Sequence, residues 1–150
     1  MSNKITGDWG EKFVAKTFAC PKCKSFNSLK RLPNNFKCAD IVCDFCGYLA
    51  QVKTVSVTDI NKFPKSILGA AWKPQKDRMK AGIYFPLYIV LKSGSKCSVF
   101  YLPTEFQLPK MFKKRNPLSD TARRAGWQGF VYDFSGFPDG IPVRVWPIDS

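Results

Sequence analysis

The chain has 150 residues, 45% of them hydrophobic and 15% aromatic, so it can bury the core of one domain and is not disordered. Its 24 lysines and arginines against 11 acidic residues give a net charge of +13, which favours a polyanionic partner such as nucleic acid. Histidine is absent, which excludes Ser-His-Asp and Cys-His catalysis, Cys2His2 fingers and histidine-based metallonucleases.

The sequence predicts no membrane segment. Met1–Trp9 has no apolar signal core. The longest apolar run, Ala81–Leu91, is shorter than the roughly 20 residues of a span and contains Pro86. We therefore expect a cytoplasmic protein that does not bind membranes. In that reducing compartment the six cysteines are expected to bind metal rather than to form disulfides.

The first predicted element is an amphipathic helix over Asp8–Phe18. Asp8 is its expected N-cap, and Glu11 stands three residues later, as in a capping box. The polar, lysine-rich stretch Cys20–Cys46 follows and holds five of the six cysteines. Tyr48–Val57 alternates and is rich in β-branched residues, which predicts a strand.

The second half of the chain is expected to be mostly strand. Asn61–Trp72 is predicted to be helical after Pro64. Ile83–Lys92 and Ser98–Leu102 are expected to pair around a turn at residues 92–95. A basic stretch follows, and two short closing strands are predicted at Val131–Tyr132 and Val143–Trp146. This order predicts an α+β fold with a mixed central sheet.

Two Cys-x-x-Cys pairs lie nineteen residues apart, and their members are Cys20, Cys23, Cys43 and Cys46. This is the spacing of a zinc ribbon, in which four thiolates hold one tetrahedral ion. A redox function is the alternative, but two matched pairs without a βαβ pattern favour zinc. Four protein ligands leave no position for a substrate, so the zinc is expected to be structural. Cys38 and Cys97 lie outside the pattern and are expected to be packed thiols.

Asp40, Gln51 and Lys53 form the next candidate group. Gln51 and Lys53 are two residues apart in the predicted strand, so their side chains share one face. The zinc hairpin would fold the chain back and bring Asp40 beside them. Asp40, the Gln51 amide and the Val52 carbonyl could then hold Mg²⁺, while Lys53 orients water. The alternative is an ordinary surface strand.

The chain resembles the DpnI-type restriction endonucleases in several places. The most specific is the run Pro117-Leu-Ser-Asp-Thr121-Ala-Arg123-Arg124-Ala-Gly126-Trp127-Gln-Gly129. The cysteine pairs have the same order, Asp40…Gln51-Val-Lys53 falls where that family carries Asp…Glu-x-Lys, and the segment around Pro138-Asp-Gly140 is similar. The resemblance runs from about Glu11 to Trp146, and its Asp…Lys pattern belongs to the wider PD-(D/E)XK nuclease class.

This resemblance implies a PD-(D/E)XK core, a mixed sheet flanked by helices, with a zinc-ribbon insertion at about residues 19–47. It implies that Asp40 is a metal ligand, Gln51 a ligand or water-orienting group, and Lys53 the residue that positions water. Glu11 is either an additional catalytic carboxylate or the capping-box residue described above. Residues 1–150 are expected to form a single nuclease domain without the C-terminal winged-helix domain of that family.

Basic and aromatic residues in the last quarter of the chain are candidates for DNA binding. Arg123 and Arg124 can bind phosphates or guanine edges, and Trp127 can stack on a base or contact a methyl group, unless it packs in the core. The other expected contacts are Lys113, Lys114, Arg115 and Thr121. A second phosphate-contacting edge is expected on the zinc ribbon, at Lys22, Lys24, Lys30 and Arg31. A solvated charged face is the alternative for each lysine.

The function that these observations predict is a Mg²⁺-dependent type II restriction endonuclease, a monomer or weak homodimer that cuts double-stranded DNA at adenine-methylated GATC. Gln51 supports a first alternative, a DNA-binding module with weakened catalysis, because an amide brings one negative charge fewer than glutamate. A zinc-ribbon RNA-binding protein is the second alternative.

Overall fold

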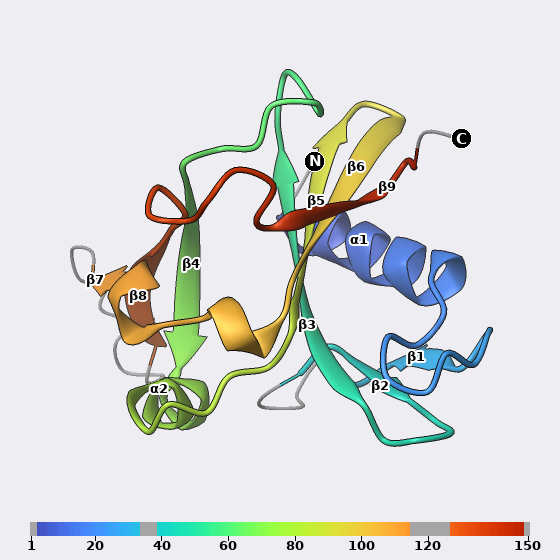
Figure 1. Cartoon of the computed structure of the whole chain (residues 1–150), viewed down its shortest axis with the longest axis horizontal. Helices are drawn as coiled ribbons and strands as arrows, with labels where there is room; N and C mark the ends of the chain where they lie inside the picture. Colours follow the sequence, from blue (N-terminus) through green and yellow to red (C-terminus); the bar gives the residue numbers. More distant parts are fainter. Residues whose placement is uncertain (1–2, 34–38, 115–126, 149–150) are drawn as a thin grey trace.

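The computed structural model describes residues 3–33, 39–114 and 127–148, which form two β-sheets with two α-helices (Figure 1). The larger sheet contains, in spatial order, β1 (Leu29–Arg31), β2 (Ile41–Cys43), β3 (Leu49–Ser56), β5 (Leu87–Ser93), β6 (Lys96–Leu102) and β9 (Val143–Trp146). β3 and β5 are parallel, and the other neighbours are antiparallel. The predicted α+β fold with a mixed central sheet is therefore confirmed, and β1 and β2, which lie between the two cysteine pairs and end at Cys43, extend this sheet.

Helix α1 (Asn3–Thr17) packs on one face of the larger sheet. It begins before the predicted start at Asp8, so Asp8 and Glu11 lie within the helix and the predicted capping box is wrong. Gly10 lets the helix approach β3 closely, because a Cβ atom there would lie 1.7 Å from Oγ1 of Thr54. This close contact fixes the distance between the helix and the strand that carries the candidate site.

The smaller sheet contains β4 (Ser66–Trp72), β8 (Trp127–Asp133) and β7 (Phe112–Lys114), all antiparallel. The helix predicted over Asn61–Trp72 is therefore wrong. Every residue of β4 pairs with β8, and Ile67 is buried in the core, so tertiary pairing decides the conformation of this segment. The helix of this region, α2 (Lys73–Lys80), starts directly after β4.

The predicted pairing of β5 with β6 is confirmed, with the turn at Gly94, whose φ is 61°. Residues 87–91 of β5 are all buried, as expected for a central strand covered on both faces. The strand predicted at Val131–Tyr132 is the end of the longer β8, and β9 matches its prediction. Two short 3-10 helices, η1 (Thr104–Phe106) and η2 (Pro109–Met111), connect β6 to β7.

Two hydrophobic clusters cover the two faces of the larger sheet. The first lies beneath α1 and includes Val14, Ile41, Ala50, Val90 and Val99. The second lies between the two sheets and includes Ile67, Ile89, Leu102, Phe130 and Tyr132. Figure 1 shows α1 and the smaller sheet on opposite sides of β3. The second cluster thus fills the region between the two sheets. Neither helix of the described residues is long and apolar enough to cross a membrane.

Candidate active site and metal centre

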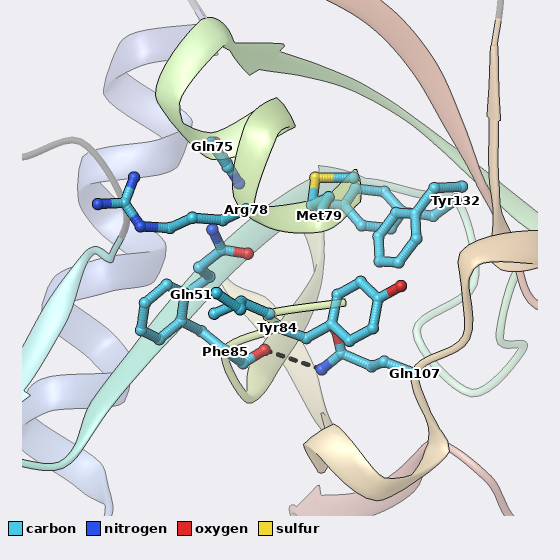
Figure 2. A pocket seen from close by; sticks show the side chains of 10 residues that line it. Gln51, Gln75, Arg78, Met79, Tyr84, Phe85, Gln107 and Tyr132 are labelled. Atoms are coloured by element: carbon cyan, nitrogen blue, oxygen red, sulfur yellow. Dashed lines mark hydrogen bonds between the residues drawn. The ribbon is translucent and has the colours of Figure 1, made fainter. Parts of the chain in front are cut away.

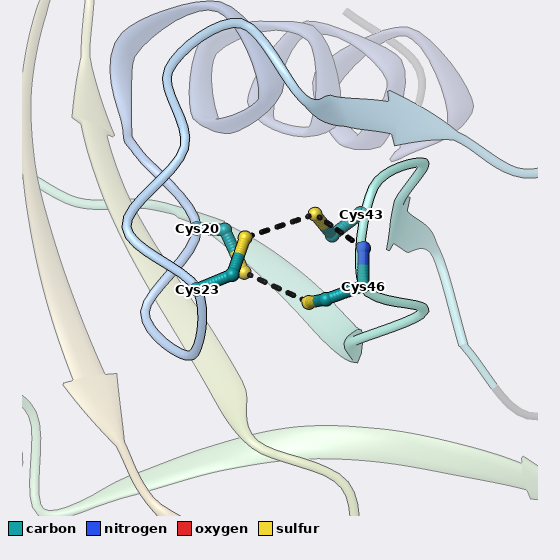
Figure 3. A group of neighbouring side chains, drawn as sticks. All are labelled: Cys20, Cys23, Cys43 and Cys46. Atoms are coloured by element: carbon teal, nitrogen blue, oxygen red, sulfur yellow. Dashed lines mark hydrogen bonds between the residues drawn. The ribbon is translucent and has the colours of Figure 1, made fainter.

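The four cysteines of the two Cys-x-x-Cys pairs converge at one end of the larger sheet (Figure 3). Their sulfur atoms all lie within 4.8 Å of one another, and the Cys20–Cys46 and Cys23–Cys43 separations are 3.6 and 3.7 Å. Four thiolates about 2.3 Å from a central ion are about 3.8 Å apart in a tetrahedron, whereas a disulfide requires about 2.05 Å. The sulfur geometry therefore fits a tetrahedral metal and excludes disulfides within the set.

The cysteine site is part of the core beneath α1. Cys20 and Cys43 are buried in that cluster, and the Cys46 N–H lies 3.5 Å from the Cys43 sulfur. Burial opposes ionisation of Cys43, but Ser28 and two backbone N–H groups outweigh it and lower the pKa of this thiol to about 6. Such donors stabilise the thiolate, the form that binds metal. Cys97 is buried away from this set, as predicted, and Cys38 is outside the described residues.

Asp40 lies beside the start of β3, as the hairpin argument predicted. Its N–H donates to the Ala50 carbonyl at 2.9 Å, directly before the Ile41–Ala50 pair of the β2–β3 register. Its Oδ2 accepts a hydrogen bond from the Val52 N–H at 2.7 Å. The N–H and C=O of a strand residue point to the same edge, so the Val52 carbonyl also faces the Asp40 side. The Asp40 carboxylate and the Val52 carbonyl thus lie on the same side of β3, next to the residue that carries the Gln51 amide.

Glu11 is connected to this edge through Arg31 of β1. The Arg31 guanidinium donates to Oδ1 of Asp8 at 2.9 Å and to Oε1 of Glu11 at 3.2 Å. Arg31 thus joins α1 to β1. Its guanidinium already has two carboxylate partners, which the prediction of a phosphate contact did not include. No pattern in the sequence indicates this network, because Arg31 lies 20 residues from Glu11 and 23 residues from Asp8.

Asp40 and Glu11 both have a raised pKa. Burial raises the pKa of Asp40, and the Val52 N–H and nearby positive charges offset only part of this effect. Burial also raises the pKa of Glu11, and the negative charge of Asp40 raises it further against the effect of Arg31. Asp40 likewise contributes to the raised pKa of buried Tyr132 in β8. A cation bound near Asp40 would relieve these unfavourable interactions.

Gln51 and Lys53 project from the face of β3 that looks toward the smaller sheet, whereas Val52 packs beneath α1. Gln51 lines a narrow pocket with α2 and with Tyr84 and Tyr132 (Figure 2). Lys53 lines an adjoining groove of about 490 Å³ between β3, β4 and the start of α1. The two side chains thus line two different hollows beside β3, and the larger one is open to solvent.

Helix α2 adds two polar residues that the sequence analysis missed. Gln75 and Arg78 line the same pocket as Gln51, and Figure 2 shows the three side chains together at one end of it. Arg78 is exposed and is a candidate phosphate contact beside the site. Pro74 in the first turn of α2 is a typical helix-start signal that could have located this element.

Most of the predicted DNA-contacting segment is outside the described residues. This applies to Arg115, Thr121, Arg123 and Arg124. Lys113 and Lys114 belong to β7, and Trp127 starts β8, the strand that pairs with β4. Lys113 is 63% exposed and lies 2.6 Å from the Asp133 carboxylate, whose pKa this contact lowers. Lys113 is thus accessible to a phosphate but already has a partner.

An aspartate opposite a Gln-x-Lys strand in a mixed sheet has the arrangement of the PD-(D/E)XK nucleases, the class that the sequence suggested. The sequence model of the DpnI family, described as the Dam-replacing family, matches residues 2–146. The chain therefore belongs to the DpnI family, and this membership identifies it as a DNA nuclease. This assignment favours DNA over the RNA alternative.

A solved structure also shows a weak similarity. It is the Holliday junction resolvase Hjc of the archaeal hyperthermophile Archaeoglobus fulgidus, at 17% sequence identity and a TM-score of 0.30. The match covers 71% of this chain and 76% of the resolvase. A similarity of this size carries no conclusion about fold or substrate.

Proposed function

We propose that the chain is a Mg²⁺-dependent endonuclease that hydrolyses phosphodiester bonds in double-stranded DNA at the edge of β3. The observation that carries this proposal is the position of Asp40. Its carboxylate accepts the Val52 N–H at 2.7 Å, and Val52 and Lys53 both line an open groove. Family membership supports the reaction class.

The residues at this edge have the chemistry that Mg²⁺ requires. The ligands would be a carboxylate oxygen of Asp40, the amide oxygen of Gln51 and the Val52 carbonyl, with Glu11 near enough to interact electrostatically with Asp40. Burial raises the pKa of both carboxylates, and the charge of Asp40 raises that of Glu11 further, so a cation bound between them would favour their ionised forms. When bound, the ion would supply an acidified water and neutralise charge on the phosphate.

The protein residues would position the reactants of the hydrolysis. Lys53, whose charge already acts on Asp40, would hold the attacking water in line with the phosphorus atom. The water oxygen forms a bond to phosphorus, the bond from phosphorus to the leaving sugar oxygen breaks, and that oxygen takes up a proton. Arg78 at the adjoining pocket would bind a neighbouring phosphate.

Four thiolates at tetrahedral distances would hold Zn²⁺ as a structural ion. It would fix the β2–β3 hairpin and, through that hairpin, the position of Asp40 opposite Gln51. The proposed substrate sequence is GATC with methylated adenine, by analogy with the enzymes that the chain resembles. Thr121, Arg123, Arg124 and Trp127 are the proposed contacts, and a monomer or weak homodimer is the proposed active form.

The direct test is digestion of one plasmid prepared with and without adenine methylation, in Mg²⁺ or in a chelator. We expect discrete, Mg²⁺-dependent fragments from the methylated plasmid alone. Cleavage of both plasmids would support the nuclease and contradict the methyl specificity. Binding without cleavage of either plasmid would favour the second candidate, a DNA-binding module with weakened catalysis, for which Gln51 is the specific observation.

Replacement of Gln51 by glutamate separates these two candidates. Gln51→Glu adds one negative charge at the proposed ligand position, so we expect the Mg²⁺ concentration for half-maximal cleavage to fall about tenfold. Gln75→Glu is the matched control, because it places the same charge in the same pocket from α2. An unchanged Mg²⁺ requirement in Gln51→Glu would remove Gln51 from the metal site. Cleavage by this variant alone would show that the natural chain is the weakened module.

A further inference from the structure

Two phenylalanines at the cysteine site are almost fully exposed to solvent. Phe26 is 81% exposed and Phe45 is 78% exposed, although the buried metal-site cysteines Cys20 and Cys43 lie only six and two residues before them. Phe26 follows the first cysteine pair, and Phe45 lies between the two cysteines of the second pair. Single exposed apolar side chains are common, but two phenyl rings at one small site are a reason to look for a partner.

The two turns that carry these rings are joined to each other. The Asp44 N–H donates to the Ser28 carbonyl at 2.8 Å, and the Cys20 and Cys46 sulfurs lie 3.6 Å apart. Figure 3 shows the two cysteine turns facing one another across the sulfur cluster. Phe26 and Phe45 are each within two residues of the Asp44–Ser28 bond. We call this surface, formed by Phe26 and Phe45 with Lys22, Lys24 and Lys30, the hairpin platform.

The charge of the hairpin platform is positive. Its three lysines are exposed, and Asp44 is the one exposed acidic residue among residues 20–33 and 41–47. Arg31 does not add to the positive charge of the hairpin platform, because its guanidinium forms ion pairs with Asp8 and Glu11. Exposed aromatic rings surrounded by lysines can stack on the faces of bases while the ammonium groups contact phosphates. A base-paired duplex hides its base faces, so this chemistry fits unpaired nucleotides.

We propose that the hairpin platform binds an unpaired nucleic acid strand by stacking Phe26 and Phe45 on its bases. This proposal depends on the surface of the metal-bound hairpin and not on the cleavage chemistry. The partner is a single strand or the single-stranded part of a partly opened duplex, since both offer the same exposed bases. The lysines supply contacts to the phosphates that do not depend on sequence.

The hairpin platform can be reached by a strand that also enters the candidate active site. Lys30 of β1 pairs with Val42 of β2, which pairs with Leu49 of β3. The adjacent row of paired residues, which contains Arg31, Ile41 and Ala50, faces α1. Lys30 therefore lies on the face of the sheet that also carries Gln51 and Lys53. Asp40 and Phe45 are five residues apart, at most about 17 Å, which is about five nucleotides at the 3.4 Å spacing of a stacked strand and fewer for an extended one.

The test is fluorescence anisotropy with a labelled oligothymidine of about 12 nucleotides and a blunt duplex of equal length, in a chelator-free buffer without Mg²⁺. We expect Phe26→Ala and Phe45→Ala each to weaken single-strand binding at least about fivefold, with little effect on the duplex. Phe45→Tyr should restore binding, because it keeps a ring. Phe106→Ala is the matched control, since that ring is 40% exposed and lies on η1.

The outcomes separate this proposal from the proposed function. Unchanged oligothymidine binding in both alanine variants with full zinc content would overturn the hairpin platform while leaving the nuclease proposal intact. Equal losses on the single strand and the duplex would also overturn it. Binding of the wild-type chain to vesicles of anionic lipid, lost in Phe26→Ala, would assign the rings to a membrane surface instead. Plasmid cleavage is measured separately, and its absence does not affect the anisotropy result.

Discussion

Asp40→Asn is expected to lower the rate of DNA cleavage about 1,000-fold, because the proposed metal loses its one carboxylate ligand on the strand edge. The asparagine oxygen can still accept the Val52 N–H, so the contact that Asp40 makes at 2.7 Å is kept. DNA affinity in a chelator should stay equal or rise, since a negative charge next to the phosphate is removed. Single-turnover cleavage and binding to the same duplex measure the two effects.

The control for this variant is Asp77→Asn, the same substitution at an exposed position of α2. We expect it to cut at the wild-type rate. Both variants should keep the wild-type melting temperature, so a loss of cleavage in Asp40→Asn cannot be assigned to unfolding. If Asp40→Asn cuts as fast as the wild type, the catalytic centre is not at this edge of β3, even though the family assignment stands.

The place of Asp40 could be predicted because its cause is local. The second Cys-x-x-Cys pair forces a tight turn between β2 and β3, and the spacing from Asp40 to Cys43 then sets the register of the two strands. Alternation along β3 places Gln51 and Lys53 on one face. These steps need only the chain between residues 40 and 53. The roles of the three residues stay predictions that the proposed experiments test.

The errors have a different origin, because they fall where distant segments decide the structure. Ser66–Trp72 is a strand since β8 pairs with it along its whole length, and β8 lies about sixty residues later. Glu11 lies within α1, which begins at Asn3, and its carboxylate binds Arg31 of β1, twenty residues later. No local pattern in the sequence reports either contact. The same reason explains why Gln75 and Arg78 were missed as neighbours of Gln51.

Cys43→Ser is expected to abolish stoichiometric zinc binding. The α1 side of the domain should then no longer unfold in a cooperative transition. Structural zinc sites in small domains contribute about 10 kcal/mol or more, which is comparable to the whole stability of about 5–15 kcal/mol for a domain. Cys43 is 1% exposed and belongs to the cluster beneath α1, so its loss affects both the metal and the core. Zinc content and thermal unfolding by circular dichroism measure the effect.

Cys97→Ser is the matched control, since Cys97 is also buried in that cluster but lies outside the metal set. It should keep its zinc and melt cooperatively. A cooperative melt of Cys43→Ser that does not depend on zinc would show that the hairpin folds without the metal. Cys43→Ser and Asp40→Asn should both fail to cut DNA, but only Asp40→Asn should keep its zinc and fold. This difference separates the structural role of the zinc ion from the proposed catalytic role of Asp40.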